Sequence, residues 1–184
     1  MQDPVKEAVI KAIHENKSRY TDVAGVMELR QAIADKTNRQ QKNLSGKNPW
    51  KPENIVVSNG GKQALFNSFL SLLNPRDEAL IPSPYWPSYP EIAKICGATP
   101  VILETSCAEG FKLTPGLLRE ALKKNAKAKI LALNSPSNPT GAVYSFEELR
   151  ILGEIIRTGA PGLWVISDEI YDRIVFDELR FSSF

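Results

Sequence analysis

The chain has 184 residues, of which 42% are apolar and 24% charged, and its formal net charge at pH 7 is +2. This length is enough for one apolar core, and the near balance of charge argues against a nucleic-acid or anionic-membrane partner, so we expect a small-molecule partner. No stretch approaches the roughly 20 consecutive apolar residues that a membrane span requires, so we expect no membrane partner either.

The first 53 residues predict two helices and a polar loop. Asp3 followed by Pro4 is typical of a helix start, and apolar residues then recur at helical spacing up to Ile13. A second amphipathic segment occupies residues 26–41, and the polar stretch "KNLSGKNPWKPEN" follows it.

From Asn54 onward, short β-rich runs alternate with helical segments. The expected strands are "IVVS", "EALI", "TPVILE", "KILALN" and "LWVIS", and the helices between them are "KQALFNSFLSLL", "YPEIAKIC", "PGLLREALKK" and "SFEELRILGEIIR". Ser145 and Glu148 form a capping box that marks the start of the last helix. This alternation predicts a three-layer α/β/α fold with a mostly parallel sheet over residues 54–184, preceded by leading helices and a loop over residues 1–53.

The start of the chain and its two cysteines favour a cytoplasmic location. The segment "MQDPVKEAV" has a proline and charges where a secretory signal carries its apolar core. Cys96 and Cys107 are too few for a disulfide framework and are typical of reduced thiols.

Ligands of a parallel sheet bind where the chain leaves the carboxyl ends of the strands, so the loops after the predicted strands belong together. The unusual ones are "NGGK", "PSPYWPSY", "SPSNPTG" and "DEIYD". The first is either a simple tight turn or a helix start whose free N–H groups suit a phosphate.

The other three loops offer a flat ring, an amide and a carboxylate. Trp86 is either a core aromatic or a stacking surface, and Asn138 lies either in a plain turn or in a rigid loop directed at a ligand. Asp168 ends the apolar run "LWVIS", where a partly buried anion needs a cation or donors. Pyridoxal 5′-phosphate is a phosphorylated cationic heterocycle, and its groups match what the four loops offer: an anion site, a flat surface, an amide and a carboxylate. Tyr171 is placed to reach its phenolic oxygen.

Five segments resemble, in order, motifs of the class I and II (fold-type I) pyridoxal-phosphate aminotransferases, particularly the bacterial aspartate aminotransferase branch: "RYTDVAGVMELRQAIA", "GGKQALFN", "SPYWPSYPE", "NSPSNPTGAVY" and "SDEIYDRIVF". The resemblance covers essentially the whole chain. It implies a homodimer that transfers an amino group between an amino acid, such as aspartate, and a 2-oxo acid. It implies no metal ion.

The same resemblance implies a role for each matching residue. The cofactor contacts would be backbone amides of Gly61, Lys62 and Gln63 at the phosphate, Trp86 stacked on the ring, Asn138 and Tyr171 at the phenolic oxygen, Asp168 at the ring nitrogen, and Tyr20 at the phosphate of the neighbouring subunit. Asp168 and Tyr171 would be the catalytic residues, and Trp86 and Asn138 would also border the bound amino acid.

One expected residue has no counterpart. The family's Schiff-base lysine lies downstream of the D-E-x-Y turn, and residues 169–184 contain no lysine. The resemblance therefore implies an incomplete large domain without its C-terminal small domain, inactive by itself. We interpret Lys62 as a phosphate counter-ion rather than a replacement for this lysine, and His14 as a surface residue.

Two alternatives stay open: an inactive fragment that acts only by association with another chain, and a pyridoxal-phosphate lyase or synthase of the same fold. A third alternative takes "LWVISDE" as the Walker B strand of a nucleoside triphosphatase. That class requires G-x-x-x-x-G-K-[ST], and the chain has Val56 and Gln63 at two of the required positions.

Overall fold

The computed structural model describes residues 3–40 and 49–184. The chain divides into a leading unit that ends at Ser58 and a sheet unit that begins at Asn59. The end of the second predicted helix at Gln41 and the first part of the predicted polar loop lie outside the described residues.

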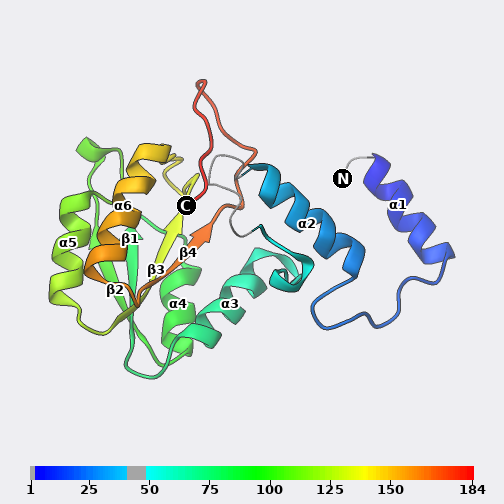
Figure 1. Cartoon of the computed structure of the whole chain (residues 1–184), viewed down its shortest axis with the longest axis horizontal. Coiled ribbons are helices and arrows are strands. Elements are labelled where there is room, and N and C mark those ends of the chain that lie inside the picture. The colour runs from blue at the N-terminus through cyan, green and yellow to red at the C-terminus, as the bar shows by residue number, and fades with distance from the viewer. Residues whose placement is uncertain (1–2, 41–48) are drawn as a thin grey trace. The chain divides into compact units, whose positions relative to one another are not determined.

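The leading unit contains both predicted helices. Its elements are α1 (Asp3–His14), α2 (Met27–Gln40) and the 3-10 helix η1 (Pro52–Asn54) (Figure 1). The side chain of Arg30 on α2 is only 7% exposed, and its Nε donates to the carbonyl oxygens of Pro52 and Ile55 at 3.0 and 3.2 Å. These two hydrogen bonds hold α2 against the segment that contains Pro52 and Ile55.

The prediction of a first strand at residues 55–58 is wrong. The Val57 N–H donates to the carbonyl oxygen of Ala24 at 2.9 Å, and Val56 is exposed. Gly25 has a φ of +99°, and a β-carbon there would lie 2.7 Å from Val57 Cγ2, so only glycine allows this approach. A β-branched run forms a strand only where a neighbouring strand pairs with it, and composition does not supply that neighbour.

The sheet unit is the predicted α/β layer structure. Its four strands are all parallel in the order β2-β1-β3-β4: β1 (Glu78–Ser83), β2 (Thr99–Glu104), β3 (Ala128–Asn134) and β4 (Trp164–Asp168). Its helices are α3 (Gly60–Leu72), α4 (Ser88–Ile95), η2 (Cys107–Glu109), α5 (Pro115–Lys124) and α6 (Phe146–Gly159). The remaining predicted strands and helices are therefore confirmed, within a few residues at their ends.

Both faces of the two central strands, β1 and β3, are buried. On β1, Leu80 belongs to the core cluster that includes side chains of α5 and α6, whereas Ala79 and Ile81 belong to the cluster with α3 and α4. Figure 1 shows these two helix pairs on opposite sides of the sheet. Successive residues of a strand point to opposite faces, so covering both faces gives the continuous apolar runs seen in the sequence.

Helix starts follow the predicted signals where a side chain caps them. The capping box is present: Ser145 Oγ accepts from the Glu148 N–H at 3.3 Å, and Glu148 Oε2 accepts from the Ser145 N–H at 2.7 Å. Thr114 caps α5 by accepting from the Leu117 N–H at 3.2 Å. These bonds satisfy N–H groups that have no partner inside their helices.

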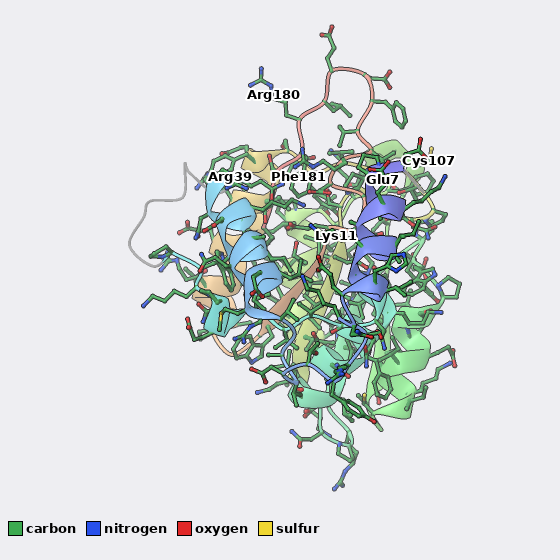
Figure 2. The ribbon with its side chains drawn as sticks, turned by 90° about the vertical axis from the view of Figure 1, so that its right-hand side faces the viewer. Glu7, Lys11, Arg39, Cys107, Arg180 and Phe181 are labelled. Atoms are coloured by element: carbon green, nitrogen blue, oxygen red, sulfur yellow. The ribbon has the colours of Figure 1, made fainter. Side chains whose placement is uncertain are left out.

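Both cysteines are free thiols, and they differ in exposure. Cys96 is buried, whereas Cys107 lies at the surface (Figure 2). Figure 2 also shows Arg180 on the loop that follows β4. Of the helices in residues 3–40 and 49–184, none has both the length and the apolar character needed to cross a bilayer.

Candidate active site

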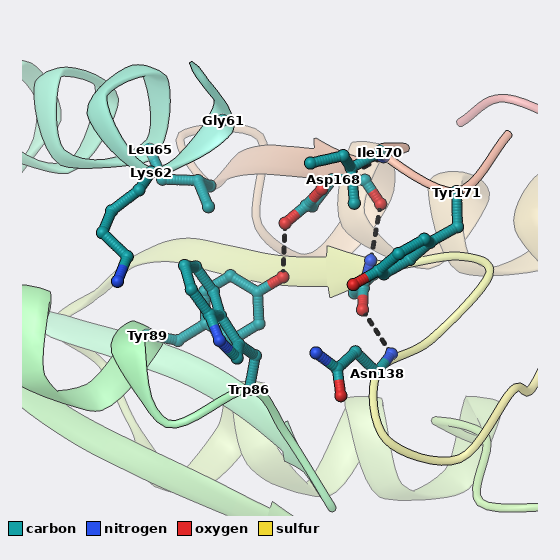
Figure 3. A pocket seen from close by; sticks show the side chains of 10 residues that line it. Gly61, Lys62, Leu65, Trp86, Tyr89, Asn138, Asp168, Ile170 and Tyr171 are labelled. Atoms are coloured by element: carbon teal, nitrogen blue, oxygen red, sulfur yellow. Dashed lines mark hydrogen bonds between the residues drawn. The ribbon is translucent and has the colours of Figure 1, made fainter. Parts of the chain in front are cut away.

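Four segments meet in a pocket of about 140 Å³ at the carboxyl ends of β1, β3 and β4 (Figure 3). The lining residues are Gly61, Lys62, Leu65, Trp86, Tyr89, Asn134, Asn138, Asp168, Ile170 and Tyr171. The four loops expected to lie at one edge of the sheet therefore do contribute to one site. The first of them arrives at the start of α3 rather than from a strand.

The start of α3 forms one wall. The helix begins at Gly60, two residues earlier than predicted, and the side chain of its N-cap residue Asn59 makes no capping hydrogen bond. Gly60 has a φ of +78°, and a β-carbon on Gly61 would lie 3.3 Å from Ile170 Cδ1. The glycines thus bring an uncapped helix N-terminus to the pocket, where its N–H groups and partial positive charge favour an anion.

The carboxylate of Asp168, at the end of β4, lies opposite that helix. Its Oδ2 accepts from the Tyr89 hydroxyl at 2.6 Å (Figure 3). Its Oδ1 accepts from the Ile170 N–H at 3.3 Å. A carboxylate has about four lone-pair sites, so two donors leave capacity for a cation from the pocket. Burial raises the pKa of Tyr89 above its usual range, and the bond to Asp168 adds to this, so the phenol keeps its proton and donates.

Asn134 joins two walls of the pocket. It ends β3 and is paired in register with Asp168 on β4. Its Nδ2 donates to the main-chain oxygen of Asp168 at 2.9 Å, and its Oδ1 accepts from the Asn138 N–H at 2.7 Å. One amide side chain therefore sets the position of the loop carrying Asn138 relative to the end of β4.

The indole of Trp86 forms the aromatic wall. Its ring meets that of Tyr89 edge to face, with centroids 5.7 Å apart and an interplanar angle of 87°. Lys62 Nζ lies 5.0 Å from the Trp86 ring centroid, within the range of a cation–π contact (Figure 3). The ammonium group of Lys62, and not only its backbone, therefore belongs to the site.

Gln63 and Tyr20 are not among the residues that line the pocket. The side-chain Oε1 of Gln63 instead accepts from the Asn59 N–H at 2.6 Å. Tyr20 lies fully exposed in the leading unit, and His14 on α1 is also an exposed residue.

Four lining residues were not predicted from the sequence: Leu65, Tyr89, Asn134 and Ile170. A signal for Asn134 was present, because it ends an apolar run as Asp168 does and the same criterion selects both. Tyr89 lies inside the quoted segment "SPYWPSYPE", but nothing in that segment shows that its hydroxyl meets β4.

Comparison with known proteins supports the interpretation reached from the site. The family model "Aminotransferase class I and II" matches residues 2–184, and the chain belongs to this family. It is 48% identical over 181 residues to the bifunctional aspartate aminotransferase and glutamate/aspartate-prephenate aminotransferase of Petunia hybrida, covering 98% of this chain and 36% of that relative. It is 40% identical to the aspartate/prephenate aminotransferase of Cereibacter sphaeroides, and the match covers 98% of this chain and 43% of that relative.

Solved structures agree in fold. The aspartate aminotransferase of Rhizobium meliloti superposes with a TM-score of 0.90 at 38% identity, covering 98% of this chain and 43% of that one. The Thermus thermophilus aspartate aminotransferase with maleate gives a TM-score of 0.87 at 40% identity, and the match covers 97% of this chain and 44% of that one. The chain thus spans less than half the length of these relatives.

Enzymes of this family depend on pyridoxal 5′-phosphate. The donor set of the pocket fits that molecule on chemical grounds. The start of α3 suits a phosphate, the Trp86 indole suits a flat ring, and the Asp168 carboxylate suits a ring cation. The expected family, fold and cofactor are confirmed.

Proposed function

We propose that the protein containing this chain is an aminotransferase that transfers the amino group of an amino acid such as aspartate to a 2-oxo acid. The observation that carries the proposal is the carboxylate of Asp168, held by two donors in a pocket also walled by the Trp86 indole and an uncapped helix start. A partly buried anion of this kind favours a cation opposite it, and a protonated pyridine ring provides one.

The place of each residue in the pocket supports the role proposed for it. Asp168 pairs with the ring nitrogen, and Trp86 stacks on the ring. Asn138 and Tyr171 hydrogen-bond the phenolic oxygen, and N–H groups at the start of α3, at Gly61 and Lys62, hold the phosphate. When bound, the cofactor supplies an electron sink for the substrate carbanion. The Schiff-base lysine is proposed to lie beyond residue 184, because residues 169–184 contain none.

The position of Lys62 supports a substrate with a second carboxylate. Its ammonium is the one cationic group among the lining residues, and it forms no ion pair with any described carboxylate. Aspartate has such a carboxylate. Relatives named for prephenate make this dicarboxylate a second candidate amino acceptor beside 2-oxoglutarate.

The proposal includes a cytoplasmic homodimer that shares its active sites. Tyr20 is fully exposed, which suits a side chain that reaches the phosphate of a neighbouring subunit. Replacing Tyr20 with Phe in one subunit would then affect the cofactor held by the other. Heterodimers of Tyr20→Phe and Asp168→Asn chains test this, because one of their two sites carries both changes and the other carries neither.

The first experiment mixes the complete protein and pyridoxal phosphate with aspartate and either 2-oxoglutarate or prephenate. Formation of oxaloacetate together with the aminated acceptor is expected. A lyase or synthase would instead release a product without aminating the acceptor, and an inactive fragment would bind the cofactor without turnover. Either result contradicts the proposal.

Lys62→Met sharpens the substrate assignment. A charge-assisted hydrogen bond is lost, so kcat/KM for aspartate should fall about tenfold, whereas that for alanine should change by less than about twofold. Steady-state kinetics with both donors measure this difference. An equal loss for both would assign Lys62 to the cofactor phosphate instead.

A further inference from the structure

Tyr89 has a place in the site that the proposed roles leave unexplained. It lies on α4, 79 residues before Asp168 in the sequence, and is only 3% exposed. Its hydroxyl nevertheless reaches the end of β4 and donates to Asp168 Oδ2 at 2.6 Å (Figure 3). A short bond to a carboxylate, made by a buried side chain, points to a specific task.

We propose that Tyr89 is a positioning residue that fixes the plane of the Asp168 carboxylate and keeps that carboxylate anionic, so that the proton of the ion pair stays on the ring nitrogen of the cofactor. The inference rests on the proposed function. It deepens that function by assigning control of the ring proton to a residue outside the expected set.

The other contacts of Asp168 do not provide this control. The bonds from Asn134 Nδ2 and the Ser135 N–H go to the main-chain oxygen, which locates the backbone but leaves the carboxylate free to rotate. The Ile170 N–H lies 3.3 Å from Oδ1, a longer and weaker contact. Tyr89 is therefore the strongest donor to the carboxylate among the described residues.

Tyr89 is itself held in place. Its ring belongs to the core cluster between the sheet and helices α3 and α4, and it packs edge to face against Trp86. A donor whose ring is fixed on two sides loses little conformational freedom when it forms its bond. The orientation of the carboxylate is thus set by the core of the unit.

The direction of the effect follows from proton balance. Two sites, the ring nitrogen and Asp168, share one proton, and Tyr89 keeps its own. A hydrogen bond donated to the carboxylate favours its charged form, which leaves the shared proton on the nitrogen. Without the hydroxyl, Oδ2 lacks a donor and the proton moves toward Asp168.

The test uses pyridoxamine 5′-phosphate labelled with ¹⁵N in its ring, added to the complete protein at pH 7. The ¹⁵N chemical shift separates protonated from neutral ring nitrogen without any turnover. In Tyr89→Phe the signal should move toward the neutral position, and affinity should fall about tenfold. Replacing Tyr89 with 3-fluorotyrosine, a stronger donor of nearly the same shape, should move the signal the opposite way.

Tyr144→Phe is the matched control. Tyr144 is also 3% exposed, but its hydroxyl accepts from the Leu113 N–H at 2.6 Å and it does not line the pocket. This variant also loses a buried tyrosine hydroxyl, yet it should leave the ¹⁵N signal unchanged. A signal that moves equally in both variants would show a general loosening of the fold and overturn the inference.

A double-mutant cycle separates positioning from structure. If Tyr89 acts through Asp168, Tyr89→Phe in an Asp168→Asn background should change affinity by less than about twofold. An undiminished effect there overturns the inference, as does an unmoved ¹⁵N signal in Tyr89→Phe. Failure of the unaltered protein to bind pyridoxamine phosphate would instead remove the proposed function, and the inference with it.

Discussion

The amino and carboxyl ends of the parallel sheet differ in what their hydrogen bonds hold in place. At the amino ends, many of the bonds close local turns. The Asn74 N–H donates to Asp77 Oδ2 at 2.8 Å, and the Leu163 N–H donates to the carbonyl oxygen of Ala160 at 2.9 Å. Each of these bonds spans three residues. A longer-range bond at the same end, from the Lys127 N–H to Glu78 Oε2 at 3.2 Å, joins the starts of two strands.

At the carboxyl ends, side chains bond across elements. Tyr89 and Asp168 are 79 residues apart, and Asn134 and Asp168 are 34 apart. The bonds at the carboxyl ends differ from those at the amino ends because they join residues that line the pocket, and they therefore place functional groups. The comparison predicts that changes at the carboxyl ends affect chemistry and that changes at the amino ends affect stability slightly or not at all.

Asp168→Ala should have the largest effect on activity. It leaves the ring cation of the cofactor without its carboxylate partner, so turnover of the complete enzyme should fall on the order of 10²- to 10³-fold, with folding largely kept. Steady-state kinetics and a thermal unfolding scan measure the two quantities. Near-normal turnover would remove Asp168 from the cofactor site.

Leu131→Ala tests the middle of the sheet, between the two ends. Leu131 is 0% exposed in the core cluster with α5 and α6, so its truncation should lower the free energy of unfolding by about 3 kcal/mol. Leu70 on α3 is 56% exposed, and Leu70→Ala should cost less than about 0.5 kcal/mol. Denaturant titration of both variants checks this difference, and equal losses would contradict the assigned core.

Alkaline pH should lower the free energy of unfolding through Tyr144. Burial raises the pKa of Tyr144 to about 12, from 10.0 for an exposed tyrosine. The neutral phenol is favoured in the folded state, so its contribution to stability is complete below pH 10 and is lost as the pH rises through 12. The loss amounts to about 2 to 3 kcal/mol.

Tyr144→Phe provides the comparison for that titration. It has no phenol to ionise, so its free energy of unfolding should fall less steeply above pH 10 than that of the unaltered protein. Burial raises the pKa of Tyr89 in the same direction, so part of the slope should remain. Identical slopes in the two proteins would show that Tyr144 does not contribute.

Asp77→Ala should have the smallest effect. It removes the acceptor of the Asn74 N–H in an exposed turn, which should cost about 0.5 to 1 kcal/mol. Because the turn lies at the amino end, binding of pyridoxamine phosphate should not change, and isothermal titration measures it. Weakened binding would show that the two ends of the sheet are not independent.

The sequence predicted those features that depend on neighbouring residues. The capping box at Ser145 and the cap at Thr114 are local signals, and both helices begin where expected. The strand at residues 55–58 failed because strand formation depends on a partner elsewhere in the chain, and the Val57 N–H pairs with Ala24 in a turn instead.

The candidate site was predictable as a set of loops but not as a network of bonds. Asp168 was selected because it ends an apolar run, and that property is visible in the sequence. The contact between Tyr89 and Asp168 joins α4 to β4 and depends on how α4 packs on the sheet. Sequence spacing carries no information about that packing.

The pairing of Asn134 with Asp168 also bears on the alignment of β3 with β4. Ile130 and Leu131 face opposite helix layers, and both are fully buried. A slip of β3 by one residue would therefore exchange one apolar side chain for another, and hydrophobic burial would barely distinguish the two alignments. It would, however, separate the Asn134 amide from the Asp168 carbonyl oxygen and leave both without their partners. The polar residues that line the pocket therefore help to set the alignment of β3 with β4. A misaligned chain would lose hydrogen bonds at its binding site while keeping most of its apolar burial.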